Sequence, residues 1–519
     1  MKFTLKFYLL IFSTTIFVSP FFAENKSAGK GSKKPSPPQM LKSEYKFLDG
    51  NTLNCTISSE GPYCDYRKTG NSGLEWPKGS GKTPIFTAGI WLGGIHRPTK
   101  EIRVSNMDYT TEYHPGPLLE TFNTTVITDK AQVTRAKEEK YRLYKTNKKD
   151  TLGNSNNIDY NEWPGDLGAP YIDVNGNKQW DKGIDKVKYY GDQQIWGVLN
   201  DVNVANHTNL STSKPMGVEI QNLYFSFNSP GALGNIMFMK WKIINKSDAD
   251  YDSVFIGMWS DPDLGDANDD LPGVDTMLSL GYLYNGDNND GTTHGYGEKP
   301  PAVGFDFFQG PSVSTDRYKQ LYPWVKVPND TFALFDGERR PGKINLPASS
   351  FVVYCNGTFP QLQDPPDKNA DYILQAYDYL NGKAGTIHQW VTHPSGRIVK
   401  YFFSGDPVAG TGDLPANFPL GNFAPQDVRI MISTGPFTLA KGDTQEIVGA
   451  IIMGQGTDRL NSITALKQAD KIAQEAFNDN FQVPAAPPLP TVKVSELSNK
   501  LIFDWSTNSD KSESYTFKG

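Results

Sequence analysis

Oxygen-bearing side chains recur at every second position across one short, glycine-containing stretch of this sequence. They are Asp173, Asn175, Asn177, Gln179 and Asp181, and Asp185 follows four residues later. A loop with this spacing can wrap several hard oxygen ligands around one calcium ion, as positions 1, 3, 5, 7 and 9 of an EF-hand loop do. We therefore predict a structural calcium site formed by these six residues.

Two positions of this loop depart from the EF-hand pattern. Lys178 occupies the sixth place, where the sharp turn favours glycine, and Ile184 occupies the twelfth, where a bidentate glutamate belongs. Asp185 can replace that glutamate from one residue further on, and Gln179 can contribute its backbone carbonyl. No clear helical pair flanks the loop, which favours an isolated calcium loop over a helix-loop-helix unit. The alternative is a turn rich in Asn, Gly and Asp that needs no ion.

A second group of acidic and amide side chains follows an apolar run that ends at Trp259. The group comprises Asp261, Asp263, Asp266, Asn268 and Asp270, with Asp269 and Asp275 beside them. Ionised carboxylates packed this densely would repel one another in the absence of a cation. We predict a second, weaker calcium site here, and the alternative is an extended, solvated acidic loop.

The common hydrolase motifs are missing from the sequence. There is no Gly-x-Ser-x-Gly elbow and no His-Glu-x-x-His zinc motif, and the six histidines are scattered. Paired carboxylates for glycoside hydrolysis can still be sought among Asp261, Asp263, Glu298 and Asp306, because a sequence does not give their separation. Catalysis needs one carboxyl held protonated in an apolar niche, so loops of Asp and Asn suit calcium better. The sequence favours a protein without enzymatic activity and leaves an enzyme as the alternative.

Composition predicts the fold class that must position these residues. The 519 residues include 48 Gly and 36 Pro, and 12% are aromatic, which is typical of many short β-strands joined by turns. The net charge is -6, so there is no overall basic field for nucleic acid, and we expect no nucleic-acid partner.

The N-terminal sequence predicts an exported protein. Lys2 and Lys6 precede the mostly apolar run from Phe7 to Phe22, so residues 1–23 are predicted to be a signal peptide and the polar residues 24–41 a flexible linker. No later stretch is long and apolar enough to span a bilayer. In an exported chain Cys55 and Cys64 are candidates for a disulfide, which leaves Cys355 over.

The main body, residues 42–482, reads as one or two β-rich subdomains. Apolar runs at 236–244 and 254–259 predict one antiparallel hairpin, and runs at 429–432 and 445–453 predict another around 441–443. Residues 462–478 predict one amphipathic helix that buries Ile463, Leu466, Ala469, Ala473 and Phe477, with Asn461 or Ser462 as its cap. The predicted fold is mainly β: antiparallel sandwich domains with long loops and one late helix.

The Pro-rich segment 483–490 is predicted to be a linker, and residues 491–519 alternate like the first strands of a small sandwich. Three strands cannot close a sandwich, so we expect this last module to be incomplete. It resembles the opening of a fibronectin type III module, with Trp505 matching the core tryptophan of the second strand.

Several short sequence segments between Tyr45 and Phe481 resemble a second group of proteins. They are residues 72–79, Trp163-Pro164 with 168–170, residues 259–265 with Asp269-Asp270, and residues 435–445. They resemble a group of large, mostly uncharacterised exported proteins of Bacteroidota-like bacteria. The resemblance implies an extracellular location, further sandwich modules and a C-terminal sorting domain for type IX secretion, but it implies no catalytic residues.

Two functions follow as hypotheses. The first is a secreted or cell-surface, calcium-stabilised β-sandwich protein with a structural, adhesion or ligand-display role. The second is an extracellular protein that binds or degrades polysaccharide through exposed aromatic platforms. The expected partners are cell-surface components or polysaccharide, and the expected cofactor is calcium.

Overall fold

The computed structural model describes residues 44–66, 69–126, 140–203, 207, 209–291, 293–356, 359–483 and 492–504. The predicted signal peptide and the linker 24–41 lie outside the described residues, as do nearly all of the linker 483–490 and residues 505–519. The protein is mainly β, as the composition predicts, and its long strands pair antiparallel.

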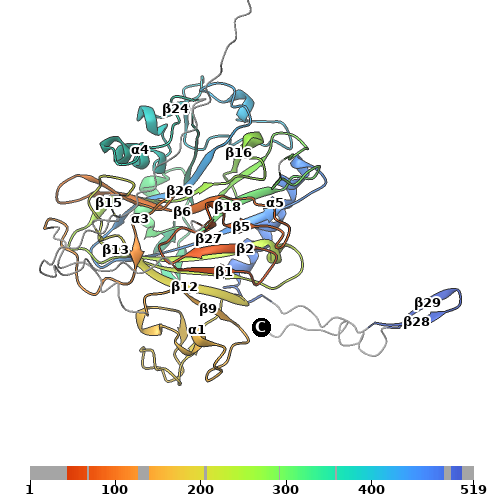
Figure 1. The fold of residues 1–519 in the computed structure, drawn as a ribbon. Coiled ribbons are helices and arrows are strands. Elements are labelled where there is room, and N and C mark those ends of the chain that lie inside the picture. Colours follow the sequence, from red (N-terminus) through yellow and green to blue (C-terminus); the bar gives the residue numbers. More distant parts are fainter. Residues whose placement is uncertain are drawn as a thin grey trace, which may run out of the picture. The chain divides into compact units, whose positions relative to one another are not determined.

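Two large antiparallel sheets make up the body within the described residues (Figure 1). The nine-stranded sheet runs in the order β16 (Asp270–Asp275), β17 (Leu280–Asn285), β18 (Ala302–Gln309), β27 (Thr444–Gly454), β14 (Ile236–Asn245), β13 (Val218–Ser226), β12 (Gln193–Asn200) and β8 (His114–Pro115), with β9 (Tyr144–Asn147) also paired to β12. The five-stranded sheet runs in the order β23 (Ala348–Tyr354), β26 (Arg429–Leu439), β15 (Tyr251–Asp261), β6 (Thr87–His96) and β7 (Ile102–Asn106).

Both predicted hairpins are wrong, because in each case the chain changes sheet at the turn. β14 pairs with β13 and β27 in the larger sheet, whereas β15 pairs with β6 and β26 in the smaller one. β26 and β27 are divided between the two sheets in the same way. The two connecting turns contact each other, since the N–H of Asn245 donates to the carbonyl of Asp443 at 3.0 Å. The arrangement is therefore sandwich-like.

The nine-stranded sheet is buried on both faces. On β14, Met237, Met239 and Trp241 belong to the hydrophobic core shared with the smaller sheet. The alternate residues Ile236 and Phe238 belong to a second core on the opposite face. A strand that is buried on both sides needs apolar residues at every position, which explains the continuous apolar run at 236–239.

Helix α5 (Arg459–Asn478) covers the second face of the nine-stranded sheet. All five apolar residues predicted to be buried are buried, which confirms the helix and its face. The predicted cap is wrong: the helix begins three residues earlier, and Asp458 accepts hydrogen bonds from the N–H groups of Leu460 and Asn461 at 3.0 Å each. The Ser462 hydroxyl instead donates to the carbonyl of Pro300 at 2.7 Å.

Helix α4 (Ala370–Leu380) packs against the five-stranded sheet. Two glycines allow this close approach. A Cβ atom placed on Gly257 would lie 2.8 Å from Leu380 Cδ2, and one on Gly93 would lie 2.9 Å from Leu380 Cδ1. Tyr372, Ala376 and Tyr379 of the same helix are buried in the shared core.

Shorter elements form small sheets and short helices besides the two large sheets. They are β1 (Tyr45–Leu48), β2 (Asn54–Ser58) and β5 (Leu74–Glu75) in one small sheet; the pairs β3 (Asp65–Tyr66) with β4 (Asn71–Ser72), β10 (Tyr171–Ile172) with β11 (Lys186–Val187), β19 (Ser312–Ser314) with β22 (Lys343–Asn345), β20 (Phe332–Phe335) with β21 (Glu338–Pro341), and β24 (Val391–Thr392) with β25 (Ile398–Val399); and the helices α1 (Ile158–Asn161) and α3 (Thr315–Leu321).

Strands β28 (Lys493–Leu497) and β29 (Lys500–Asp504) form an antiparallel hairpin in the C-terminal segment. The fibronectin type III resemblance of this segment stays a prediction, and Trp505 lies outside the described residues. None of the helices described is long and apolar enough to cross a membrane.

Cys55 and Cys64 are buried free thiols whose Sγ atoms lie 3.5 Å apart, and the predicted disulfide between them stays a prediction. Cys355 is also buried and free.

Candidate metal centre

Three carboxylates meet where strand β15 ends and strand β26 begins. The two strands are antiparallel, and Ser260 lies opposite Ile430, so the next position on β15, Asp261, comes beside Arg429 at the start of β26. Asp263 follows the end of β15, and Asp427 precedes β26 by two residues. Pairing of the two strands therefore gathers acidic residues that are more than 160 positions apart in the sequence.

The ligand atoms of Asp261, Asp263 and Asp427 all lie within 4.8 Å of one another. Of all the residues that the structure describes, only these three form such a group of His, Cys, Asp or Glu. Asp261 is 4% exposed, and its Oδ1 atom receives no hydrogen bond. Asp263 and Asp427 are half-buried, so the group opens toward solvent on their side.

Arg429 and Tyr109 hold Asp261 in place. The Tyr109 hydroxyl donates to Asp261 Oδ2 at 2.8 Å, and Arg429 Nε donates to the Tyr109 oxygen at 2.6 Å. Arg429 Nη1 also donates to Asp427 Oδ1 at 3.0 Å. Arg429 Nε lies 3.5 Å from Asp261 Oδ1 and 3.8 Å from Asp364 Oδ1.

Aromatic residues surround this polar group. The ring of Tyr109 packs edge-on against Trp259 at 5.3 Å between ring centroids, and Trp259 stacks on Trp91 at 6.1 Å. Trp259 Nε1 donates to the hydroxyl of Tyr354 at 2.5 Å. Trp91 and Trp259 are each 1% exposed, whereas Tyr109 is 43% exposed. Asp261 is itself buried, and the low dielectric around a buried group strengthens its electrostatic interactions.

The electrostatics of the site show an excess of negative charge. Burial raises the pKa of Asp261 to about 8, with repulsion from Asp263 adding to the effect and Arg429 opposing it. Burial and Asp427 raise the pKa of Asp263 to about 6. Burial lowers the pKa of Arg429, but Asp261 and the neighbouring acids more than offset this, so its pKa lies above its usual value. One guanidinium cannot neutralise Asp261, Asp263, Asp364 and Asp427 together.

A group of this composition can hold a hard metal ion. Carboxylate oxygens are the ligands that calcium, magnesium and manganese prefer, and no cysteine or histidine belongs to the group. Asp261 Oδ1 accepts no hydrogen bond from the described residues and has only an ion-pair contact with Arg429, so it can ligate an ion, whereas Asp427 already binds Arg429 through a hydrogen bond to one oxygen. Calcium takes six to eight oxygens, so three side chains would need water molecules to complete the shell on the solvent side.

The structure divides the second predicted calcium site. Only Asp261 and Asp263 belong to the carboxylate group just described. Asp266 Oδ1 accepts hydrogen bonds from the backbone and side chain of Asn268, at 3.1 and 3.0 Å, and so caps a short helical turn. Asn268 is exposed, and Asp270 lies at the start of β16 with its Oδ2 bound to the N–H of Leu264 at 3.1 Å. Of the five predicted residues, only Asp261 and Asp263 join the carboxylate group, and a calcium site in this segment stays a prediction.

The first predicted loop joins strands β10 and β11, outside any helix pair. Asp181 Oδ2 accepts hydrogen bonds from the amides of Asn175 and Asn177, at 2.8 and 2.6 Å. Asp185 accepts from the N–H groups of Val174 and Asp181, at 2.9 and 2.8 Å. Two of the predicted ligands, Asn175 and Asn177, therefore bind the carboxylate of Asp181, while Asp185 accepts from the Asp181 backbone.

The remaining predicted ligands of this loop serve its backbone. Asp173 accepts from the N–H groups of Gly176 and Lys178, at 2.7 and 2.8 Å, and Asn177 Oδ1 accepts from the N–H of Gln179 at 2.8 Å. Lys178 has a φ of 63°, so the sixth position adopts the left-handed conformation that glycine usually provides. The calcium site in this loop stays a prediction.

Sequence reasoning missed Tyr109, Asp364, Asp427 and Arg429. Arg429 was predicted to begin a strand, which is correct, but nothing local to it indicates which acidic residues it will meet. The usable signal is its charge: a buried arginine at the end of an apolar strand needs carboxylate partners.

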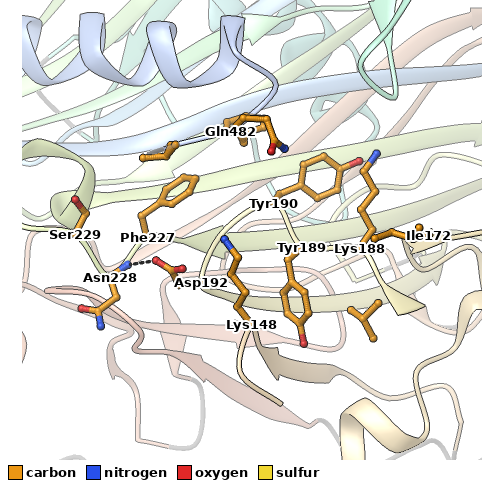
Figure 2. A pocket seen from close by; sticks show the side chains of 13 residues that line it. Lys148, Ile172, Lys188, Tyr189, Tyr190, Asp192, Phe227, Asn228, Ser229 and Gln482 are labelled. Carbon is orange, nitrogen blue, oxygen red and sulfur yellow. Dashed lines mark hydrogen bonds between the residues drawn. The ribbon is translucent and has the colours of Figure 1, made fainter. Parts of the chain in front are cut away.

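The structure also contains a pocket of about 450 Å³, and none of the three carboxylates lines it. Figure 2 shows Lys148, Tyr189, Tyr190 and Phe227 among the side chains around it. Phe481 lines it as well, and Lys188 lies over the ring of Tyr190 at 5.0 Å. Asp192 accepts a hydrogen bond from the N–H of Asn228 at 3.0 Å.

No protein-family model and no curated protein matches this chain. The class of protein is defined by the fold and the site: a mainly β, antiparallel, sandwich-like protein with a carboxylate group that can hold a metal ion.

Proposed function

We propose that this chain is a secreted or cell-surface β-sandwich protein that calcium stabilises, with a structural, adhesion or ligand-display role. The observation that carries the proposal is the convergence of Asp261, Asp263 and Asp427 within 4.8 Å of one another with a single arginine to balance them. Their charges favour a cation between the ends of β15 and β26. The N-terminal sequence and the resemblance to exported Bacteroidota-like proteins support the location.

The loop at residues 173–185 supports the same proposal. The side-chain amides of Asn175 and Asn177 donate to Asp181. Trp180 anchors the loop by packing against the ring of Tyr171 at 5.4 Å and against the second hydrophobic core. An ion bound in the loop would therefore stabilise the adjoining strands. Extracellular calcium is abundant, so affinities of roughly 10⁻⁴ to 10⁻³ M are sufficient for such sites.

The test of the proposal is thermal unfolding of the full chain in calcium and in EDTA. At a calcium concentration roughly ten to one hundred times the dissociation constant, one site stabilises the folded state by about 1.4–2.7 kcal/mol. We expect a higher melting temperature in calcium, a smaller rise for Asp427→Asn and for Asp181→Asn, and the smallest rise for the double variant.

The matched control is Asp330→Asn, which removes an exposed carboxylate outside both sites. Its calcium response should equal that of the wild type. Equal melting temperatures of the wild type in calcium and in EDTA would refute the calcium proposal.

A second candidate function is polysaccharide binding, and the pocket shown in Figure 2 favours it. The partly exposed ring of Tyr189 offers an aromatic face on which a sugar ring can stack, and Lys148 and Asp192 offer hydrogen-bonding groups. Tyr190 and Phe227 are buried and contribute apolar lining. A pocket of about 450 Å³ falls in the range that holds a small ligand.

Binding to a panel of glycans, with product analysis, tests this second function. If a glycan binds in the pocket, Lys148→Ala should weaken its binding by about tenfold, the usual effect of losing one charged hydrogen bond. Lys149→Ala changes the exposed neighbouring lysine and should leave affinity unchanged. Equal losses in both variants would place binding elsewhere, and a released product would identify an enzyme.

A further inference from the structure

A second set of buried oxygens lies at the edge of the nine-stranded sheet, where β16 begins and β17 ends. Asp270 is the first residue of β16, and its partner across the antiparallel ladder is Asn285, the last residue of β17. Side chains directly opposite each other in an antiparallel pair lie on the same face, about 5 Å apart at Cβ. Asp269 precedes Asp270 and receives a hydrogen bond from Asn285 Nδ2 on its Oδ2 at 2.9 Å.

Each of these three side chains keeps one oxygen without a partner. The atoms are Asp269 Oδ1, Asp270 Oδ1 and Asn285 Oδ1, all buried and all without a hydrogen-bond donor among the described residues. Asp270 is 1% exposed and Asn285 is fully buried. The Asn285 amide is held beside Asp269 by its Nδ2 hydrogen bond and lies opposite Asp270 in the strand ladder. A buried oxygen with no donor costs free energy, and three neighbouring ones indicate an absent common partner.

The remaining oxygens in this region are already occupied. Asp270 Oδ2 accepts from the N–H of Leu264 at 3.1 Å. Both oxygens of Asp290 accept backbone hydrogen bonds, from Asp266 at 3.0 Å and from Tyr296 at 2.7 Å. Asp290 also lies against Gly265, where a Cβ atom would come within 2.0 Å of its Oδ2. The packing thus fixes Asp290 as a support for the loop and leaves the other three oxygens for a ligand.

No cationic side chain among the described residues neutralises these carboxylates. Neither Asp269 nor Asp270 has an ion pair with any lysine, arginine or histidine that the structure describes. Burial raises the pKa of Asp269 to about 7, with repulsion from Asp290 and Asp266 adding to it. Burial likewise raises the pKa of Asp270 well above its usual value. A proton could neutralise one carboxylate, but it would leave the other two oxygens unpartnered.

We propose that Asp269, Asp270 and Asn285 form a separate binding site for a hard divalent cation, ligated through their three unpartnered oxygens. Calcium is the metal class that fits a mixed set of two carboxylates and one amide carbonyl, with water completing the shell. The set differs from the carboxylate group at Asp261, Asp263 and Asp427.

The two sites share one loop. Residues 261–270 begin with ligands of the first site and end with ligands of the second, and Asp263 is among the charges that act on Asp270. Ions at both ends would hold the whole connection between β15 and β16, and so would join the five-stranded sheet to the edge of the nine-stranded one. The inference extends the proposed calcium stabilisation but rests on its own residues.

Counting the calcium ions bound by the full chain, by calorimetric titration of EDTA-treated protein, tests this site. We expect Asp270→Asn to lose one bound ion per chain and Asp427→Asn to lose a different one, with the double variant losing both. Asp287→Asn, an exposed carboxylate in the adjacent loop, is the control and should bind as many ions as the wild type.

Thermal unfolding of the same proteins guards against a variant that is merely misfolded. In EDTA, Asp270→Asn should melt at or above the wild-type temperature because it removes a buried carboxyl group that the charges of Asp269, Asp263 and Asp290 disfavour. In calcium, it should melt below the wild type. Asp269→Asn, at a less buried position, should show the same reversal.

The outcomes separate the two proposals. Undiminished calcium binding by both Asp270→Asn and Asp269→Asn would overturn the second site, and loss of an ion from Asp427→Asn would still support the first. Loss confined to Asp270→Asn and Asp269→Asn would support the second site and contradict the first. A wild-type chain that binds no calcium would overturn both.

Discussion

Asp306 and Asp470 form a buried carboxyl pair beneath helix α5. Asp306 lies on β18 and is fully buried, Asp470 is 1% exposed, and each carboxyl faces the other. Two neighbouring buried carboxyl groups avoid repelling each other only if one of them carries a proton. Burial raises the pKa of both groups, to about 6 for Asp470, and repulsion from Asp470 adds to the effect on Asp306.

This pair makes the docking of α5 sensitive to pH. The pKa values in the folded state exceed the unfolded value of about 3.9, so the folded state binds the shared proton more tightly. The stability from this proton is fully present below about pH 4 and is lost as the pH rises through about 6 and above. Asp275, which is paired with Lys467 at 2.9 Å, adds negative charge nearby, and Lys471 opposes it.

We expect Asp470→Asn to flatten this dependence. Relative to the wild type, the variant should gain on the order of 2 kcal/mol between pH 5 and pH 8, measured by urea unfolding in EDTA. Asp479→Asn, at the exposed C-terminal end of the same helix, is the control. A constant difference between Asp470→Asn and the wild type over this pH range would show that the pair does not share a proton.

The same pair limits one earlier hypothesis about catalysis. Asp306 was a candidate for a glycosidase carboxylate, but it is closed off by α5 and faces Asp470.

Asp261 and Asp263 could be predicted as ligands from their spacing alone. Asp427, Arg429 and Asn285 could not, because only strand pairing brings them to those carboxylates or to Asp270.

At the level of elements, local pattern identified strands well and their partners poorly. The runs at 236–244 and 254–259 are strands β14 and β15, as predicted, yet they belong to different sheets. A short polar turn between two apolar strands fits a hairpin and a crossing between sheets equally well. The continuous apolar character of β14 was the better signal, since it indicated a strand buried on both faces.

Helix α4 offers a test of how closely an element packs on the smaller sheet. Gly257→Ala would place its Cβ 2.7 Å from Met431 Sδ and 2.8 Å from Leu380 Cδ2. We expect a loss of about 1–3 kcal/mol in the free energy of unfolding, the usual cost of overpacking a core. Denaturant unfolding measures this change.

The control for this substitution is Gly291→Ala, where the nearest atom to the new Cβ is 3.7 Å away on an exposed loop. Its stability should match that of the wild type within about 0.5 kcal/mol. An unchanged stability of Gly257→Ala would mean that α4 can move away from the sheet at little cost.

At the level of the whole molecule, composition predicted the mainly β class, and amphipathic spacing predicted the one long helix. The sheet order could not be predicted, because pairing of residues hundreds of positions apart leaves no local trace. The calcium proposal belongs to this scale, since its sites tie strand ends of one sheet to loops of the other. The calcium sites are therefore tested by the stability of the full chain in calcium and in EDTA.

The contact between the two crossing turns bears on how this chain folds. β14 and β15 lie near the middle of the body, and each takes as one of its two neighbours a strand from residues 429–454. During synthesis neither large sheet can close until that last segment has been added. Pairing across so long a stretch of chain raises the contact order, which slows folding. Until β26 and β27 have been synthesised, one edge of β14 and one edge of β15 have no partner strand. Unpaired strand edges expose the nascent protein to aggregation and to binding by chaperones.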